Sequence, residues 1–369
     1  MINVKKSIQM NLRQSFYLEH RVHTQLAYAL PRLLPHRYVF VLTNVCNLEC
    51  SFCFQRKDAR KDSMKTEDWL NLAKQLPRYA CVTLTGGEPF AFKGFNEVFD
   101  VVGWRFDCNI ITNGLLLNKE RIEYLLSSPK LRTLSISVDN RGNTVRGVKP
   151  EDWTRTEGMM RYFRKRRDEL GSDCVLEAKT VVLDDNSESL LDIHRYCIED
   201  LECDHHSFQF LKGSPVQHAD FMFKTEDILK KSHAPVYKKF ETIKDQLEKI
   251  RQYNRENNAV CFLHPKVGSL IGRQPLPDVD YINNEEHVKE NFKPCQFPWS
   301  SVHINVDGDL FPCMAIPMGN VRKQALPNII FGDKFMEFKA LIRKEGTVEA
   351  CNRCGWLVPD KRKVGSNHV

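Results

Sequence analysis

Three cysteines stand close together near the start of the chain, at Cys46, Cys50 and Cys53, in a CxxxCxxC spacing. They follow the apolar residues 38–42, which predict a buried strand with the thiols on the loop after it. Clustered thiolates bind zinc or iron–sulfur clusters, and both kinds of site normally use four protein ligands. The spacing therefore leaves three interpretations open: half of a zinc site, an iron–sulfur cluster with one open iron, or three chance cysteines.

A second group of cysteines lies near the end of the chain, at Cys295, Cys313, Cys351 and Cys354. The last two form a CxxC pair, and the Asp-Gly step at 307–308 predicts a tight hairpin just before Cys313. Four thiolates saturate one [4Fe–4S] cluster or one structural zinc ion, and the spacing alone does not separate these. The remaining cysteines are expected to be buried as small apolar side chains: Cys81, Cys108, Cys174, Cys197, Cys203 and Cys261.

The composition of the chain is that of an ordinary globular protein. It has 369 residues, 42% of them hydrophobic and 27% charged, with a formal net charge of +7. The mild positive charge is compatible with docking of an acidic redox partner and equally with an ordinary solvated surface. No arginine-rich segment, secretion signal or membrane-spanning run is visible, so the sequence predicts a cytoplasmic protein that binds neither nucleic acid nor membrane.

Strand-like and helix-like segments alternate after residue 37. This alternation predicts an α/β fold with a parallel sheet, in the form of a partial (β/α)6 barrel similar to a TIM barrel. Functional loops in such a sheet follow the carboxyl ends of the strands, and the first thiol loop lies at such an end. The expected strands are 38–42, 81–85, 105–112, 131–138, 174–182 and 205–211, and the expected helices between them are 66–76, 95–102, 119–126, 154–170 and 187–197.

Four segments are expected along the chain. Residues 1–37 form an N-terminal helical extension, and residues 38–213 form the core barrel. Residues 214–294 form a helical and loop-rich connector, in which 236–254 has the apolar spacing of a packed helix. Residues 295–369 form a small cysteine-rich α+β domain that ends in a polar tail.

The first thiol group, together with four segments that follow later strands, resembles the radical S-adenosylmethionine (radical SAM) superfamily over residues 38–213. The companion segments are Gly-Gly-Glu-Pro after the second strand, Thr-Asn-Gly after the third, Ser-Ile-Ser-Val-Asp on the fourth and 181–186 after the fifth. The resemblance implies that Cys46, Cys50 and Cys53 bind a [4Fe–4S] cluster whose open iron takes S-adenosylmethionine. It also implies a set of cofactor contacts: Phe52, Gly86, Gly87, Glu88, Pro89, Thr112, Asn113, Ser137 and Asp139.

One-electron chemistry follows from this resemblance. The reduced cluster of the family cleaves S-adenosylmethionine and forms a 5′-deoxyadenosyl radical, which takes a hydrogen atom from the substrate. The cofactor supplies that step, while the protein positions the reactants and excludes water.

The second cysteine group resembles the C-terminal "twitch" domain of that superfamily, a shortened SPASM domain with one auxiliary [4Fe–4S] cluster. A cluster with four cysteine ligands is closed to substrate, so it serves as an electron relay or as a structural brace. The spacing also resembles 2-deoxy-scyllo-inosamine dehydrogenase-like enzymes, whose relatives oxidise, deoxygenate or epimerise sugars. A zinc ion in this domain remains an alternative.

Substrate-handling residues are expected on the fifth and sixth strands. Glu177 and Lys179 share one strand face by the period of two, and a charged pair is unusual on a buried strand. Either side chain can bind a substrate hydroxyl group or take a proton after hydrogen abstraction, and a plain ion pair is the structural alternative. His205 on the sixth strand is a further candidate base.

These observations predict a radical SAM enzyme, of oxidoreductase type, that abstracts hydrogen from a sugar- or aminocyclitol-like substrate, with oxidation, dehydration or epimerisation as the outcome. A peptide-modifying maturase is the first alternative. An iron–sulfur protein without catalysis, serving as a scaffold, is the alternative from another class.

Overall fold

The computed structural model describes residues 19–30, 32–55, 63–214, 216–217, 222–229, 236–264, 282–283 and 292–360. Much of the predicted loop-rich connector, residues 1–18 of the predicted N-terminal helical extension and the polar tail from 361 lie outside these residues. None of the helices in the described part of the chain is long and apolar enough to span a bilayer.

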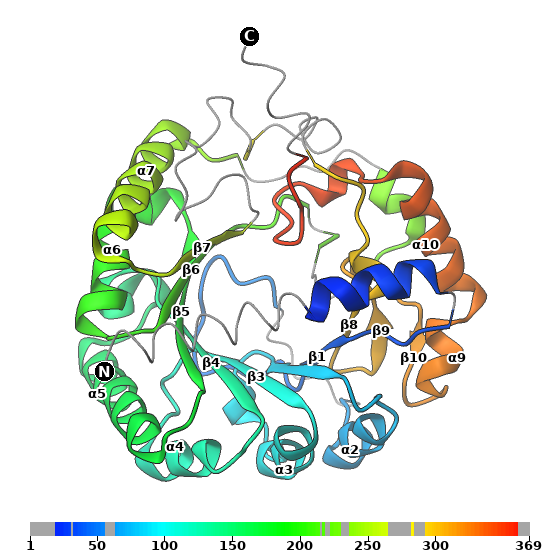
Figure 1. Ribbon diagram of the computed structural model, residues 1–369, viewed down its shortest axis with the longest axis horizontal. Helices are drawn as coiled ribbons and strands as arrows, with labels where there is room; N and C mark the ends of the chain where they lie inside the picture. Colours follow the sequence, from blue (N-terminus) through cyan, green and yellow to red (C-terminus); the bar gives the residue numbers. More distant parts are fainter. Residues whose placement is uncertain are drawn as a thin grey trace.

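The described strands form one ten-stranded sheet in the order β10-β9-β8-β1-β2-β3-β4-β5-β6-β7. Strands β1 to β7 run parallel to their neighbours, and the sheet curves into a barrel with helices on its outside (Figure 1). The parallel strands are β1 (Arg37–Val41), β2 (Cys81–Thr85), β3 (Asp107–Thr112), β4 (Leu131–Ser137), β5 (Val175–Val182), β6 (His205–Phe210) and β7 (Cys261–His264).

The helices between these strands begin and end near the expected positions. Residues 19–29 form a helix ahead of β1. The rest are α2 (Thr66–Lys74), α3 (Phe95–Arg105), α4 (Lys119–Leu126), α5 (Pro150–Leu170), α6 (Leu190–Arg195), α7 (Phe240–Asn257), α9 (Leu326–Ile330) and α10 (Asp333–Glu345). Helix α5 starts four residues earlier than the expected 154 because Pro150 occupies its first turn, where proline fits.

Two features of the sheet differ from the sequence-based expectation. Strand β7 lies in the segment predicted as helical and loop-rich, and it pairs in parallel with β6. It has only four residues, which is too short a run for a period-two pattern to be recognised. The predicted hairpin is present as β8 (Ser301–Ile304) and β9 (Asp309–Phe311), followed by β10 (Gly319–Asn320), but β8 also pairs in parallel with β1 and extends the barrel sheet.

The two faces of the curved sheet have different chemistry. Phe40 packs on Trp69 of α2, and Phe208 packs on His194 of α6, so this set of strand positions faces the helices. The alternate positions face the inside of the barrel, which we call the lumen, and near the carboxyl ends of the strands they are partly exposed. These lumen positions are Thr85, Ile111, Ser137, Lys179, Gln209 and His264.

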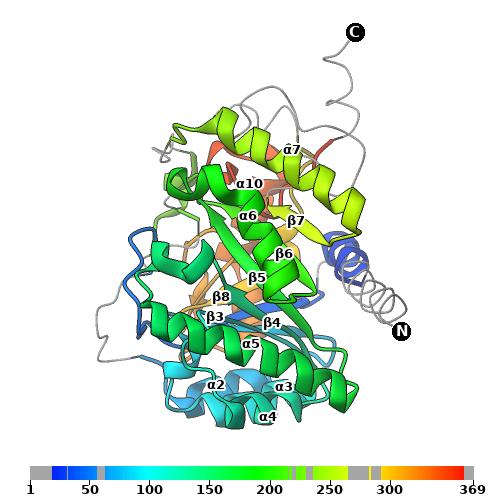
Figure 2. The same cartoon turned by 90° about the vertical axis from the view of Figure 1, so that its left-hand side faces the viewer.

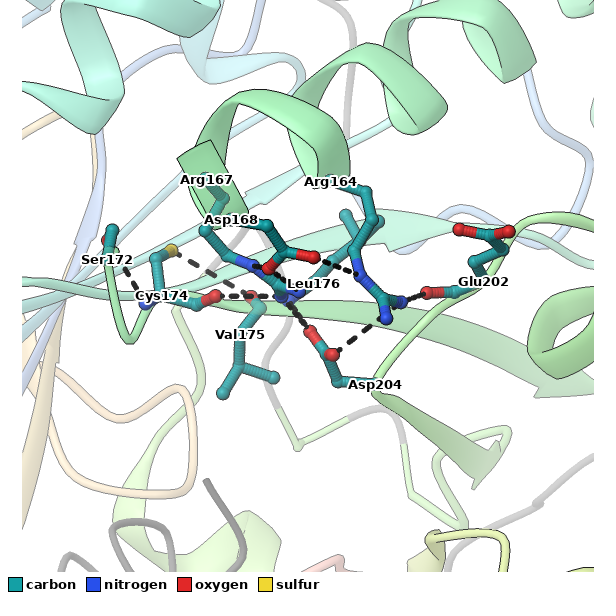
Figure 3. Close-up of polar contacts among 9 residues, drawn as sticks. All are labelled: Arg164, Arg167, Asp168, Ser172, Cys174, Val175, Leu176, Glu202 and Asp204. Carbon is teal, nitrogen blue, oxygen red and sulfur yellow. Dashed lines mark hydrogen bonds and ion pairs between the residues drawn. The ribbon is translucent and has the colours of Figure 1, made fainter. Parts of the chain in front are cut away.

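A buried ion-pair network fixes the opposite end of β5 and β6. Arg167 at the end of α5 is 1% exposed and contacts the Asp204 carboxylate just before β6, and its guanidinium also donates to the Cys174 carbonyl oxygen at 3.1 Å (Figure 3). The Leu176 amide of β5 donates to the same Asp204 carboxylate at 2.8 Å. The network therefore sets the relative position of the two strands that carry the candidate substrate residues.

Two stacked histidines lie between the sheet and the outer helices. The rings of His194 and His206 are 5.2 Å apart, with their Nδ1 atoms at 2.9 Å, and both side chains are fully buried. His206 also bonds to Thr180 at 2.8 Å, and His194 bonds to Asn254 of α7 at 2.7 Å. The chain of contacts ties β5 and β6 to α6 and α7. Figure 2 shows these two helices side by side over β5 and β6.

We expect the free energy of unfolding to fall as the pH is lowered from about 6.5 to about 4. Burial lowers the pKa of His194 from 6.5 to about 4, so in this window the unfolded chain binds a proton that the folded chain does not. The loss is on the order of 3 kcal/mol by pH 4. Urea unfolding followed by circular dichroism measures it, and the His194→Gln variant should show a flatter dependence. An equal slope in the two proteins would contradict this origin.

Candidate functional site

The first thiol loop is held by the glycine-rich loop of the neighbouring strand. The Gly87 amide donates to the Thr43 carbonyl oxygen at 2.6 Å, and the Glu88 amide donates to the Val45 carbonyl oxygen at 2.9 Å. Residues 43–45 connect β1 to Cys46, so these two bonds position the start of the thiol loop. The loops after β1 and β2 thereby form one unit at the carboxyl end of the sheet.

Both glycines in the second loop are required by this contact. A Cβ atom on Gly87 would lie 2.5 Å from the Val45 carbonyl oxygen, and one on Gly86 would lie 2.7 Å from the Thr43 carbonyl oxygen. The sequence suggested that the glycines admit a ligand. The structure shows that the two glycines allow close contact with the backbone just before the thiol loop, and both remain partly exposed.

Glu88 is a fully buried carboxylate that joins the loops after β2 and β3. It accepts hydrogen bonds from the Thr112 hydroxyl at 2.8 Å, the Asn113 amide at 2.9 Å and the Phe90 amide at 3.2 Å. Burial raises its pKa, and these three donors and Arg121 act against that rise. Pro89 is buried in the short turn Pro89–Ala91 that follows. Glu88, Pro89 and Thr112 therefore help to position the loops, and their predicted contacts with the cofactor stay predictions.

Asn113 reaches the thiol loop directly. Its side-chain amide donates to the Asn47 side chain at 2.8 Å and lies 3.8 Å from the Cys46 sulfur. Ser137, at the end of β4, is partly exposed on the lumen side, and its carbonyl oxygen accepts from Asn143 at 2.9 Å. Their contacts with the cofactor stay predictions.

Arg146 connects three of the predicted site residues, and the sequence analysis missed it. Its guanidinium pairs with the buried Asp139 carboxylate at 2.5 Å, lies 3.8 Å from the Cys50 sulfur and covers the Phe52 ring at 5.3 Å from the ring centre. Burial raises the pKa of Asp139, and Arg146 opposes that rise. The only available signal in the sequence was an arginine in the loop after the fourth strand.

The three thiols of the first group lie within electrostatic range of one another. Burial raises the pKa of the Cys46 thiol, and the nearby Glu88, Cys50 and Cys53 raise it further, while the Leu48 amide opposes the rise. Cys46 and Cys50 are half-buried and Cys53 is exposed, so the group opens outward. An external ligand can therefore reach it.

The four C-terminal cysteines also gather in one place. Burial raises the pKa of Cys313, and Cys295, Cys354 and Cys351 contribute in the same direction. Across the described ranges, no three His, Cys, Asp or Glu side chains converge on one metal-ion position. A [4Fe–4S] cluster needs a wider arrangement, because each thiolate binds a different iron.

The CxxC knuckle, residues 351–354, packs against the carboxyl ends of the barrel strands. The Gly213 amide after β6 donates to the Asn352 carbonyl oxygen at 3.2 Å, and a Cβ atom on Gly213 would lie 2.5 Å from that oxygen. Gln217 donates to the same oxygen at 2.8 Å. The second cysteine group is thus fixed on the end of β6.

Arg353, inside the knuckle, extends this contact to β5. It is 1% exposed, and its guanidinium lies 4.9 Å from the Tyr237 ring centre and 3.3 Å from the Asn283 side-chain oxygen. The Tyr237 hydroxyl donates to the Val182 carbonyl oxygen at the end of β5 at 2.6 Å. The short red C-terminal segment accordingly lies across the opening between β7 and β8 in Figure 1.

The three candidate catalytic residues share the lumen side of β5 and β6. Glu177 accepts from Ser135 and Ser207 at 2.6 Å each and pairs with Lys179 at 3.2 Å, so the ion pair that was the structural alternative is present. Glu177 and His205 are both 2% exposed, whereas the Lys179 side chain is 35% exposed. Their catalytic roles stay predictions, and Lys179 is the one that reaches the open part of the lumen.

Comparison with known proteins places two domains on the chain. The radical SAM superfamily model matches residues 40–173, and the iron–sulfur cluster-binding SPASM model matches residues 295–355. Within the sequence relatives, the sporulation killing factor maturation protein SkfB of Bacillus subtilis (strain 168) is 36% identical over 120 residues, which are 31% of this chain and 29% of SkfB.

Two more relatives add to this result. The antilisterial bacteriocin subtilosin biosynthesis protein AlbA of Bacillus subtilis (strain 168) is 30% identical over 149 residues, which are 39% of this chain and 32% of AlbA. The chain therefore matches about a third or less of the length of these two curated relatives. The structure of SuiB of Streptococcus suis, bound to precursor peptide SuiA, superposes on this chain with a TM-score of 0.60 at 18% sequence identity. The superposition covers 88% of this chain and 70% of the SuiB chain, and at this identity it shows the fold alone.

The finer resemblance to 2-deoxy-scyllo-inosamine dehydrogenase-like enzymes stays a prediction. A structure of BtrN in complex with AdoMet and 2-DOIA gives a TM-score of 0.41, which is too low to carry an argument.

Proposed function

We propose that this chain, on which a radical SAM model and an SPASM model both match, is an enzyme that modifies a peptide. It uses S-adenosylmethionine and [4Fe–4S] clusters, as these two domains do. The choice of a peptide substrate is supported by the names of two sequence relatives, since SkfB is a maturation protein and AlbA is a bacteriocin biosynthesis protein. A peptide substrate is therefore favoured over the sugar or aminocyclitol substrate that the sequence analysis favoured.

The first site, as proposed, uses the loops after β1, β2 and β4. Cys46, Cys50 and Cys53 would hold the cluster, and the outward-facing opening beside them would receive the cofactor. When bound, S-adenosylmethionine supplies the 5′-deoxyadenosyl radical that removes a hydrogen atom from the substrate. The Arg146 guanidinium is held next to Cys50 because it pairs with the Asp139 carboxylate. Buried charges held in this way keep their positions without further reorganisation.

The second site, in this proposal, lies on the far side of the lumen. The knuckle is fixed to the end of β6 through Gly213, while the first thiol loop follows β1. A peptide side chain in the lumen would then lie between the two cysteine groups, next to Lys179. The Glu177 carboxylate, which pairs with the Lys179 ammonium group, would take the proton that is released when a substrate radical gives up its electron to the second cluster. A flavodoxin- or ferredoxin-type donor would supply the electron for the first cluster.

The proposed function predicts that hydrogen is taken from a peptide. Anaerobically reconstituted enzyme is incubated with S-adenosylmethionine, dithionite and a deuterated candidate precursor peptide. We expect deuterium in 5′-deoxyadenosine and a lower mass of the peptide by mass spectrometry. Cys50→Ala serves as the inactive control. Deuterium transfer from a labelled aminocyclitol, with none from the peptide, would overturn the proposal.

A further inference from the structure

A small hollow lies between the N-terminal helix (19–29) and α10. Its volume is about 140 Å³, and the described residues around it include Tyr28, Leu30, Leu33, Trp299, Lys339 and Arg343. An engineered protein cavity of about 150 Å³ binds benzene, so this hollow has room for one apolar side chain. No carboxylate is present among the described residues that line it.

Two cations face this hollow without an anion. Lys339 is 5% exposed, and its amine lies 4.4 Å from the Phe335 ring centre, with no hydrogen bond or ion pair to another described residue. Arg343 covers the Tyr28 ring at 4.4 Å and donates to the Tyr28 carbonyl oxygen at 2.9 Å. A buried ammonium group is costly unless it is paired, so the arrangement favours an anionic ligand.

An apolar ridge leads from solvent to the hollow along the N-terminal helix. Val22, Leu26 and Leu30 are 50%, 48% and 51% exposed. Their spacing of four residues places them on one face of the helix, and Leu30 also lines the hollow. Exposed apolar side chains in such a continuous row mark an interaction surface more often than scattered ones.

We propose that the ridge and the hollow form a docking site for an acidic amphipathic helix of the peptide substrate, an inference that rests on the proposed function. One apolar side chain of that helix occupies the hollow, and a neighbouring carboxylate pairs with Lys339. Such anchors at four-residue spacing are the usual mode of helix recognition in a groove.

The position of the hollow suits a tether. Leu33 and Trp299 come just before β1 and β8, so the hollow lies at the amino ends of these strands, whereas the first thiol loop follows the carboxyl end of β1. A peptide anchored here keeps its remaining residues close to the lumen at a raised effective concentration. The docking helix and the modified residues are therefore different parts of the peptide.

Fluorescence anisotropy on the full reconstituted protein tests this site. The probe is a labelled synthetic helix with leucine and glutamate at four-residue spacing, and the comparison peptide carries lysine in place of glutamate. We expect the acidic probe to bind the unchanged protein and Lys344→Met equally, and Lys339→Met at least about tenfold more weakly. Lys344 is an exposed lysine of the same helix α10 and so controls for net charge. The lysine probe should not bind.

Three results would overturn the proposal: no binding of the acidic probe, equal binding to Lys339→Met, or binding of 3-phenylpropionate to the hollow without binding of the helix. Circular dichroism of Lys339→Met excludes loss of the fold, and Lys339→Arg should restore binding. This assay involves no turnover. A failure of peptide deuterium transfer with intact probe binding would therefore refute the proposed function, and the opposite pattern would refute the docking site.

Discussion

The Cys50→Ala variant is expected to form no 5′-deoxyadenosine above background, whereas Cys354→Ala is expected to form it and to fail later. Cys50 belongs to the group with three thiolates, and losing one leaves two protein ligands for the cluster that binds S-adenosylmethionine. Its sulfur also lies beside Arg146, at 3.8 Å from Nη1 and 3.9 Å from the carbonyl oxygen. Cys354 belongs to the other group, on the end of β6, so its loss leaves the first site intact.

Liquid chromatography of reactions with dithionite and S-adenosylmethionine measures this contrast. Iron analysis should give about eight irons for each unchanged chain and about four for either variant, if each group holds one [4Fe–4S] cluster. Four irons and one zinc in the unchanged protein would show that the second cysteine group binds zinc, which cannot serve as an electron relay. Equal loss of 5′-deoxyadenosine in the two variants would show that the second group is needed before cleavage.

The Gly87→Ala variant is expected to lose the first cluster while keeping its fold. The new methyl group would lie 2.5 Å from the Val45 carbonyl oxygen and 2.7 Å from that of Asn44, so the backbone before Cys46 must move. Overpacking of this kind costs about 1–3 kcal/mol of stability. The larger effect is on the cluster, because a displaced Cys46 no longer faces Cys50 and Cys53.

Gly158→Ala is the matched control for this substitution. Gly158 lies in α5, and a Cβ atom there would have no neighbour within 4 Å. Alanine stabilises a helix interior by about 1 kcal/mol relative to glycine, so this variant should be as active as the unchanged protein and slightly more stable. Visible absorption of the cluster and thermal unfolding compare the two variants. A normal first cluster in Gly87→Ala would contradict the packing argument.

The sequence predicted the parallel sheet and the cysteine groups because both depend on local patterns. Runs such as 81–85 and 119–126 alternate or repeat with the period of their element, and the structure has β2 and α4 at these bounds. The glycine pair at 86–87 was also visible, although its packing role was not. That role depends on a contact with residues 43–45, which are distant in the sequence.

Features that depend on contacts between distant parts of the chain were missed, because no local sequence pattern marks them. Arg146 belongs to no local sequence pattern. Its place in the site is visible only in the fold, where it lies beside Cys50, which is 96 residues away in the sequence. The sequence did not show that the Glu88 carboxylate accepts hydrogen bonds from Thr112 and Asn113 on the next loop, and its predicted contact with the cofactor stays a prediction. The catalytic roles of Glu177, Lys179 and His205 remain predictions. A shared strand face indicates which side chains are neighbours, but it does not indicate which of them reacts.

The parallel pairing of β1 with β8 has a consequence for biosynthesis. Arg37 at the start of β1 bonds to Ser301 at the start of β8, and these residues are 264 positions apart. At about 5–20 residues per second, a ribosome needs on the order of 10 to 50 s to supply that partner. Until then one edge of β1 is unpaired, and unpaired edges invite association with other chains. The nascent protein is therefore expected to depend on chaperones until the SPASM strands emerge.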